Sequence, residues 1–395
     1  MSKTFLVTLK PVDKFFFGGD MTFAIPSEGD RKTANEAYSS YIIRSSRFPQ
    51  QTSLLGMLRF LLLNDSKYFA DGEIIKGDKV EDDVAKLIGP RSFAVSKERG
   101  NFGQIQDLSA CFLIDKFNPK LPVRYSFASF DSEFESAPSD VTGVVNGKKI
   151  SMPTLGGYSA KTGYTERLKG SDGKYRSISD VFVEDRRIGI ARNIGTGKTD
   201  ENSLFKQVGY RFNDYFKDKE KKTTRKIADW HFAFYVTVSD ECDFLKFDGN
   251  VVSVGGDASQ FVLRCKEVVS IQQKDQTTSL KVILQSPSYI KRSDLNKVTF
   301  FMSQIVPFRF MTTTVKDTKD YTLKSGYQRS CRYELYAPGS VFYFSNEKDV
   351  TEFKKTLESY EAFRQIGYNE YKYFHNEKDE NISVADNCQD QPSRR

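Results

Sequence analysis

Alternating apolar and polar positions open the chain and recur near its middle. Phe5, Val7 and Leu9 alternate with less apolar neighbours, which predicts a first strand, and Gly18–Gly19 end the aromatic cluster that follows in a loop. The stretch from Trp230 to Ser239 repeats this period of two more clearly. We expect it to begin a second domain.

A wide apolar face predicts a helix after the first loop, in "SSRFPQQTSLLGMLRFLLLND". Pro49 cannot lie inside this helix, and Thr52 or Ser53 can cap it. Thr52, Gly56 and Arg59 lie away from most of the apolar side chains. They fit two interpretations: an anion held at the helix start, or a packing glycine beside a solvated arginine.

Residues 136–180 form a polar, glycine-rich insertion with seven Lys and Arg against four acidic residues. Tyr158, Tyr164 and Tyr175 are interleaved with the cations. This mixture suits single-stranded nucleic acid, because cations follow phosphates while rings stack on unpaired bases. The alternative is a flexible polar surface insertion.

The order of these patterns predicts an α+β protein with two similar units. We assign residues 1–217 to an N-terminal domain that includes the insertion, 218–228 to a charged linker and 229–375 to a C-terminal domain. A helix is expected from about 350 to 365, ended by Gly367. Residues 376–395 lack apolar content, which predicts a disordered tail.

Composition narrows the class of protein. The 395 residues carry a net charge of +7, a mild basic excess that is compatible with nucleic acid. Five widely spaced cysteines and two histidines indicate neither a disulfide framework nor a zinc site, so we expect no metal and no cofactor. The chain starts directly in a predicted strand, and its most hydrophobic run, residues 54–63, is too short to span a bilayer. We therefore expect a cytoplasmic protein.

The stretch "IGTGKT" looks like the phosphate-binding loop of a nucleotide hydrolase. Gly197, Lys198 and Thr199 fit the end of that motif, but Arg192 stands where its first glycine should be. Two other interpretations stay open: an ordinary hairpin loop, and a loop that holds phosphates without hydrolysing them.

Catalytic motifs are weak. His231 lies on a predicted strand and His375 lies near the tail, and both fit structural or solvent-facing roles better than catalysis. A metal-independent RNA cleavage needs only a general base and a charge stabiliser, so His231 with a lysine is a minor alternative.

Read in order, five segments resemble a known family: "LKPVDKFFFGG", "SSRFPQQTSLLGMLRFLLL", "EDRRIGIARNIGTGKTDENSLFKQVGYRF", "SVGGDASQF" and "APGSVFYF". The family is the RAMP-superfamily subunit number three of the Cmr complex, the type III-B CRISPR effector. The resemblance implies two ferredoxin-like (RRM-type) domains and no catalytic activity. It also implies a subunit that grips the 5′ tag of the CRISPR RNA and contacts the large polymerase-type subunit and the backbone RAMP subunit, without contact to a membrane.

The same resemblance implies a β-hairpin at the boundary between tag and guide, for which the insertion at 136–180 is the candidate. One segment departs from the family pattern. RAMP proteins commonly end in a glycine-rich loop, whereas "RQIGYNEYKYF" contains one glycine. This difference puts phosphate contacts by that loop, and ribonuclease activity, in doubt.

We therefore predict a non-catalytic RNA-binding subunit. The alternatives are a RAMP endoribonuclease that processes repeat RNA, the equivalent tag-binding subunit of another type III complex, and a structural subunit that binds protein alone. The predicted RNA contacts come from the glycine loops, the helix start, the insertion and the hairpin loop: Gly18, Gly19, Arg47, Gln50, Gln51, Thr52, Ser53, Arg59, Tyr158, Lys161, Arg187, Arg192, Asn193, Thr196, Lys198, Gly255 and Gly256.

Overall fold

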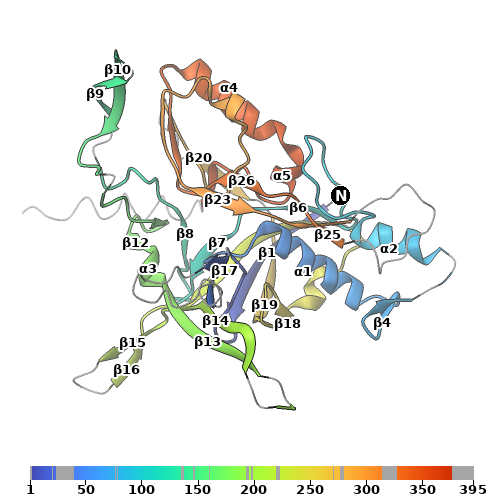
Figure 1. The fold of residues 1–395 in the computed structure, drawn as a ribbon. Coiled ribbons are helices and arrows are strands. Elements are labelled where there is room, and N and C mark those ends of the chain that lie inside the picture. Colours follow the sequence, from blue (N-terminus) through green and yellow to red (C-terminus); the bar gives the residue numbers. More distant parts are fainter. Residues whose placement is uncertain are drawn as a thin grey trace, which may run out of the picture.

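The computed structural model is an α+β protein in which sheets dominate and helices are few (Figure 1). It describes residues 2–19, 21–23, 40–75, 77, 79–134, 138–145, 147–159, 161–192, 195–196, 199–218, 223–269, 271–275, 280–313 and 327–375. The predicted tail at 376–395 lies outside the described residues.

A nine-stranded sheet forms the centre of the molecule. Strand β1 (Ser2–Pro11) lies between β17 (Trp230–Ser239) and β19 (Gln260–Val268), antiparallel to both. The strands run in the order β12-β11-β8-β7-β17-β1-β19-β18, and β6 also pairs with β17. The other members are β6 (Ile105–Leu108), β7 (Phe112–Asp115), β8 (Val123–Phe127), β11 (Arg167–Gly170), β12 (Tyr175–Ser177) and β18 (Val251–Ser253).

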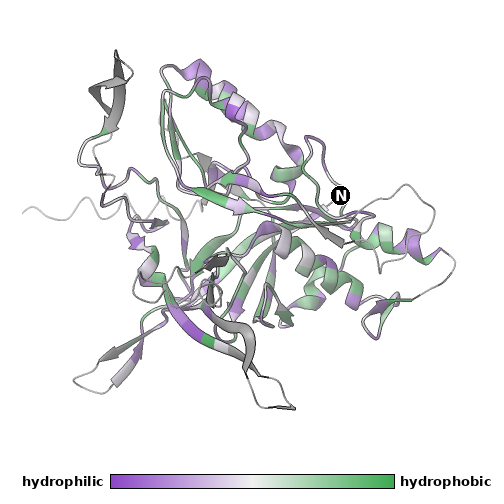
Figure 2. Ribbon diagram, viewed as in Figure 1, coloured by the Kyte–Doolittle hydropathy of each residue, from purple (hydrophilic) through white to green (hydrophobic). Residues whose placement is uncertain are grey.

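The two faces of this sheet follow the alternation seen in the sequence. Phe5, Val7 and Leu9 of β1 are buried in the main core together with the apolar face of α1 (Gln51–Asn64). Phe112 and Tyr235 belong to a smaller apolar cluster on the opposite face. Figure 2 shows the central strands as largely hydrophobic.

The predicted linker at 218–228 lies between two strands of the same sheet, β1 and β17. Strands from both sides of residues 218–228 share the central sheet, so this segment does not separate two sheets. Its described part contributes to a hairpin formed by β15 (Tyr215–Asp218) and β16 (Thr223–Lys226). Periodicity identified the strand at 230–239 correctly, but it carries no information about the strand with which it pairs.

Three hairpins project from the body, and they include β15–β16 (Figure 1). Strands β9 (Pro138–Val145) and β10 (Lys148–Leu155) form a hairpin inside the predicted insertion. The longest arm joins β13 (Phe182–Arg192) to β14 (Thr199–Phe212), and β14 also pairs with β3 (Ser40–Arg44), which pairs with β2 (Met21–Phe23). The segment "IGTGKT" thus joins two antiparallel strands. A phosphate-binding loop of a hydrolase would lead into a helix, so the hydrolase interpretation is wrong.

The C-terminal part carries its own apolar cluster, which includes Phe342, Phe353 and Leu357. The predicted helix at 350–365 is present as two helices, α4 (Glu347–Ser359) and α5 (Glu361–Gln365). The surrounding strands are β20 (Gln272–Asp275), β21 (Lys281–Ile283), β22 (Phe300–Met302), β23 (Ile305–Phe308), β24 (Met311–Thr313), β25 (Tyr327–Arg329), β26 (Tyr333–Tyr336), β27 (Val341–Tyr343) and β28 (Lys372–His375).

Short elements complete the fold: β4 (Phe69–Ala70), β5 (Glu73–Ile74), α2 (Val80–Ile88), α3 (Ile178–Val181) and the 3-10 turns η2 (Phe244–Phe247) and η3 (Arg292–Leu295). Within the described part of the chain, no helix has the length and apolar character needed to cross a membrane.

Candidate nucleic-acid interface

The loop that follows β1 brings several predicted segments together. Phe15 forms an antiparallel bridge with Tyr210 of β14, and Phe16 forms one with Gly256. The backbone N–H of Phe17 donates to Ser45 Oγ at 2.8 Å. Residues far apart in the sequence therefore meet around Phe15–Phe17. We call the surface formed by Gly18–Gly19, Ser45–Arg47, Arg187 and Gly255–Gly256 the glycine-loop surface.

The glycines of this surface mainly permit close packing of protein on protein. Gly255 has φ +85°, and a Cβ there would lie 2.4 Å from the Phe16 carbonyl oxygen. The Gly256 N–H donates to the same oxygen at 2.8 Å. A Cβ on Gly19 would collide with the carbonyl of Arg44, whereas one on Gly18 would meet nothing within 4 Å. Of these four glycines, Gly18 is the one with open space for a ligand.

The start of α1 is covered by protein. Gln51 is buried, and its Nε2 donates to the carbonyls of Ser109 at 2.8 Å and Gly367 at 3.1 Å. Gly367 packs directly against this amide, and the buried Tyr368 hydroxyl lies beside Thr52. The single glycine of "RQIGYNEYKYF" thus serves packing against the helix.

This cover corrects the sequence-based assignment at the helix start. The Gln51 amide is committed to protein carbonyls, and the Ser53 N–H donates to the carbonyl of Gln50, at 2.9 Å. Gln50, the N-cap residue, makes no side-chain cap hydrogen bond. We therefore remove Gln51 from the proposed RNA contacts, since its amide is already used by protein, whereas the half-buried Thr52 and Ser53 stay predictions.

Arg47 is connected to the loop after β1 through Tyr210, which bridges Phe15. Its guanidinium donates to Glu166 at 2.7 Å and lies over the Tyr210 ring, 5.7 Å from the ring centroid. A guanidinium has five N–H donors in a rigid fork, so one carboxylate leaves donors for a phosphate.

Arg187 lies at a neighbouring cavity of about 180 Å³ between the loop after β1, the β13–β14 arm and the glycine turn. The lining contains two cations, Lys14 and Arg187, and three carboxylates, Asp13, Asp185 and Asp257. Asp185 lies 3.5 Å from Lys14 and 3.6 Å from Arg187. A phosphate entering this cavity would face these carboxylates, so a position outside the cavity, at Arg47 and Gly18, suits it better.

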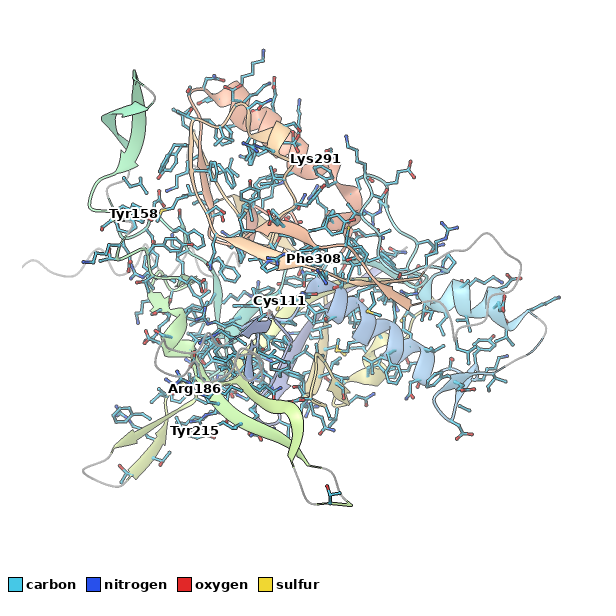
Figure 3. The ribbon with its side chains drawn as sticks, viewed as in Figure 1. Cys111, Tyr158, Arg186, Tyr215, Lys291 and Phe308 are labelled. Carbon is cyan, nitrogen blue, oxygen red and sulfur yellow. The ribbon has the colours of Figure 1, made fainter. Side chains whose placement is uncertain are left out.

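Seven predicted residues lie away from this surface, in the hairpin loop or outside the described residues. Arg59 donates from Nη2 to the Gly89 carbonyl at 3.1 Å, near α2. Tyr158 packs edge-to-face on Phe134 at the base of the β9–β10 hairpin, 5.5 Å between centroids, and Lys161 is exposed close by in sequence (Figure 3). Thr196 is exposed in the turn between β13 and β14. Arg192 ends β13, and Asn193 and Lys198 lie outside the described residues.

Two arginines that the sequence analysis did not select lie beside the predicted ones. Arg44 and Arg186 both pair with Glu184, and their side chains are 54% and 76% exposed. A hydrogen bond with Tyr210 raises the pKa of the Arg44 guanidinium above its usual value. The hydrophilic run of β13, to which Arg186 belongs, stands out in Figure 2, and Arg186 is labelled in Figure 3. The sequence contained a signal for Arg186 in the run "EDRR". Neighbouring residues of a strand point to opposite faces, so Arg186 and Arg187 should have been considered as separate candidates.

His231, the residue of the ribonuclease alternative, is buried on the sheet. Its Nε2 lies 3.4 Å from Asp229 Oδ2. Burial and the nearby Lys116 and Lys10 lower the pKa of His231 to about 4, against the opposing influence of Asp229. At neutral pH the imidazole is therefore uncharged and largely shielded from solvent.

Among the described residues, no group of three or more His, Cys, Asp or Glu side chains is arranged to hold a metal ion. The four cysteines that the structure describes are Cys111, Cys242, Cys265 and Cys331, and all are free thiols. Burial raises the pKa of Cys242 and Cys265 to about 11, so neither is a reactive thiolate at neutral pH.

The family model for CRISPR-associated protein (Cas_Cmr3) matches residues 7–373. This chain belongs to the Cas_Cmr3 family. The match confirms the resemblance found in the five ordered segments, and it runs from β1 to β28. In this Cas_Cmr3 protein, the matched region thus contains the entire glycine-loop surface and all three projecting hairpins.

Two solved structures are similar to this Cas_Cmr3 chain. One is a chain of the "Type III-B Cmr-beta bound to cognate target RNA", with 14% identity, a TM-score of 0.47, and coverage of 93% of this chain and 95% of that chain. The other is a chain of the same assembly "bound to cognate target RNA and AMPPnP, state 1", with 12% identity, a TM-score of 0.46 and the same coverage. Among curated proteins, none matches this sequence.

Proposed function

We propose that this Cas_Cmr3 protein is a non-catalytic RNA-binding subunit of a type III-B CRISPR (Cmr) ribonucleoprotein in the cytoplasm. In this role it holds the 5′ repeat-derived tag of the CRISPR RNA. The family match supports membership in such a complex. The observation that supports the RNA role is the meeting of the segments that contain Gly18, Ser45 and Gly256 around Phe15–Phe17. Arg47 lies over the Tyr210 ring, which bridges Phe15, and Arg187 lines the cavity beside Phe15 and Phe16.

The chemistry of this surface suits an RNA backbone. Arg44, Arg47 and Arg186 present guanidinium groups near one another, each already held by a carboxylate that orients it. A phosphate can accept from the remaining N–H groups, which costs little side-chain entropy because the carboxylates already fix the arginines. The open backbone at Gly18 lets the RNA strand approach closely.

The projecting hairpins fit the rest of the proposed role. The β9–β10 hairpin lies within the predicted insertion and extends from the body, as an element at the boundary of tag and guide would have to do (Figure 1). We propose that the large polymerase-type subunit and the backbone RAMP subunit contact this protein on either side of the bound tag.

The proposal keeps the ferredoxin-like units that the family resemblance implies. The central order β7-β17-β1-β19, with β1 inside the sheet and α1 packed on one face, supports the first unit. In this unit β17 and β19 come from beyond residue 228, so the unit is built from both halves of the sequence.

The test begins with RNA that co-purifies with the protein from its ribonucleoprotein. We expect short RNAs with a constant 5′ end. Fluorescence anisotropy then measures the affinity of the assembled complex for a labelled copy, at several salt concentrations. Changing Arg47→Gln together with Arg186→Gln should weaken binding about tenfold or more and make the salt dependence shallower by about 0.7 for each lost phosphate contact.

The matched control is Arg99→Gln. Arg99 is half-exposed and pairs with Asp107 at 2.7 Å, so it shares the charge and pairing of Arg47 but lies elsewhere. Equal RNA affinity in the double variant and this control would reject the assigned surface. Incubation with labelled repeat RNA in the absence of metal tests the non-catalytic part, where a cleavage product that disappears in His231→Gln would support the ribonuclease alternative instead.

A further inference from the structure

A second cavity, of about 200 Å³, lies on a different part of the molecule. Strands β8, β11 and β28 border it, and Cys111, labelled in Figure 3, marks its position. Its lining shares no residue with the glycine-loop surface. The described lining includes three cations, Arg124, Lys169 and Lys372, and no carboxylate.

These cations differ from those of the glycine-loop surface in their pairing. Among the described residues, no carboxylate lies within 4.0 Å of Arg124 or Lys169, whereas Lys372 reaches Glu358 only at 4.0 Å. Arg124 lies over the Tyr235 ring, 5.9 Å from its centroid, which holds the guanidinium in place. Arg124 and Lys169 thus lie in one cavity lining without a paired carboxylate, and Lys372 adds a third positive charge that Glu358 compensates only weakly. An anion in the cavity would reduce the repulsion between these cations.

Two serine hydroxyl groups also lie around the cavity. Ser126 Oγ donates to the Lys169 carbonyl at 3.4 Å, whereas Ser171 Oγ accepts from the backbone N–H of Arg124 at 3.2 Å, which leaves its own proton to donate. The nearest carboxylate of this turn, Asp172, accepts from the Lys174 N–H at 3.1 Å and lies 3.9 Å from the Lys174 ammonium. Its charge is therefore largely balanced by Lys174.

Three aromatic residues, Phe112, Tyr125 and Phe127, are among those that line the cavity beside the cations. Phe112 and Tyr125 are buried in two different apolar clusters, which fix their positions, and Phe127 is half-buried. A ligand that carries several negative charges at one end and a flat ring at the other matches this arrangement, because cations bind phosphates while aromatic walls contact a base.

We propose that this cavity binds a small nucleoside phosphate of the nucleoside diphosphate class. Arg124, Lys169 and Lys372 would bind the phosphates, whose charge of about −3 at neutral pH matches the three cations. The site is separate from the proposed tag-binding surface, and the inference does not depend on that function.

Isothermal titration calorimetry of the full chain with ADP tests the proposal. We expect saturable binding that weakens about tenfold in Lys169→Gln and in Lys372→Gln, since each removes one charge-assisted hydrogen bond. The matched control is Lys348→Gln, which removes one exposed lysine on α4, outside the cavity lining, and should leave ADP binding unchanged. Thermal unfolding of each variant checks that the fold is intact.

Three results would overturn the proposal. The first is the absence of ADP binding at millimolar concentration, and the second is an equal loss of affinity in Lys348→Gln. The third is inorganic phosphate binding as tightly as ADP, which would indicate a simple anion site. Competition with tag RNA distinguishes a nucleotide site from an RNA-binding site. If the RNA displaces ADP, and Lys169→Gln weakens RNA binding as much as ADP binding, the cavity is part of the RNA-binding surface and the separate site is rejected.

Discussion

Thr4 and Thr237 face each other across β1 and β17, with their hydroxyl oxygens 3.1 Å apart, although 233 residues separate them in the sequence. This pair belongs to the eight residue pairs that join β1 to β17. On its other edge, β1 pairs with β19. The first strand of the protein therefore has both of its neighbours in the second half of the chain. Neither half contains the complete central sheet.

This arrangement predicts how fragments behave. Residues 1–218 expressed alone should not unfold cooperatively, because β1 then lacks β17 and β19 and the main core is exposed. Co-expression with residues 223–395 should restore the folded protein as a complex of the two fragments, since the break falls in the exposed β15–β16 hairpin. Circular dichroism during heating measures this. A cooperative transition in the isolated N-terminal fragment would show that it forms a separate domain after all.

The contact between the glycine turn and Phe16 predicts a difference between two glycine substitutions. Gly255→Ala should destabilise the protein by about 3 kcal/mol, because it combines a left-handed φ with a methyl group pressed against the Phe16 carbonyl. Gly18→Ala has a similar φ of +77° but open space around the new methyl group. It should cost only about 1 kcal/mol.

Urea unfolding of both variants measures this difference in stability. Equal losses in the free energy of unfolding would mean that the backbone conformation alone determines the cost. The carbonyl of Phe16 would then move aside at little cost. Because Gly18 is also a proposed RNA contact, Gly18→Ala should weaken RNA binding while it costs only about 1 kcal/mol of stability.

The buried His231 predicts a dependence of stability on pH. Its pKa is lowered to about 4 in the folded protein, from 6.5 in an exposed histidine. The unfolded chain therefore binds the proton more readily, so the stability contribution is complete above pH 6.5 and is lost as the pH falls toward 4. Between pH 7 and pH 5 the loss should be about 2 kcal/mol.

Urea midpoints at pH 7 and pH 5, compared between the natural protein and His231→Gln, measure this effect. The variant should lose about 2 kcal/mol less over the interval, since its side chain does not titrate. An identical loss in both proteins would show that His231 is charged or solvated in the fold. The same variant serves the RNA cleavage assay above.

Local patterns in the sequence identified elements well. The period of two at Trp230–Ser239, the apolar face that follows Pro49 and the glycine pairs at 18–19 and 255–256 appear as β17, α1 and tight loops. The ordered segments also indicated the family that the family model matches. These elements depend on residues that are close in the chain. Periodicity and turn residues report on such local relationships, which is why they could be predicted.

Tertiary structure decided which elements meet. It paired β17 with β1, covered the start of α1 with Gly367 and Tyr368, and turned Gly255 toward Phe16. It also gathered Arg124, Lys169 and Lys372 from three separate strands around one cavity. Strands β1 and β17 and helix α1 could be predicted from local spacing, and the family from five segments in order, because each of these signals lies within short stretches of the chain. The sheet partners and the charged cavity follow from contacts between distant residues, whose energies no local pattern contains.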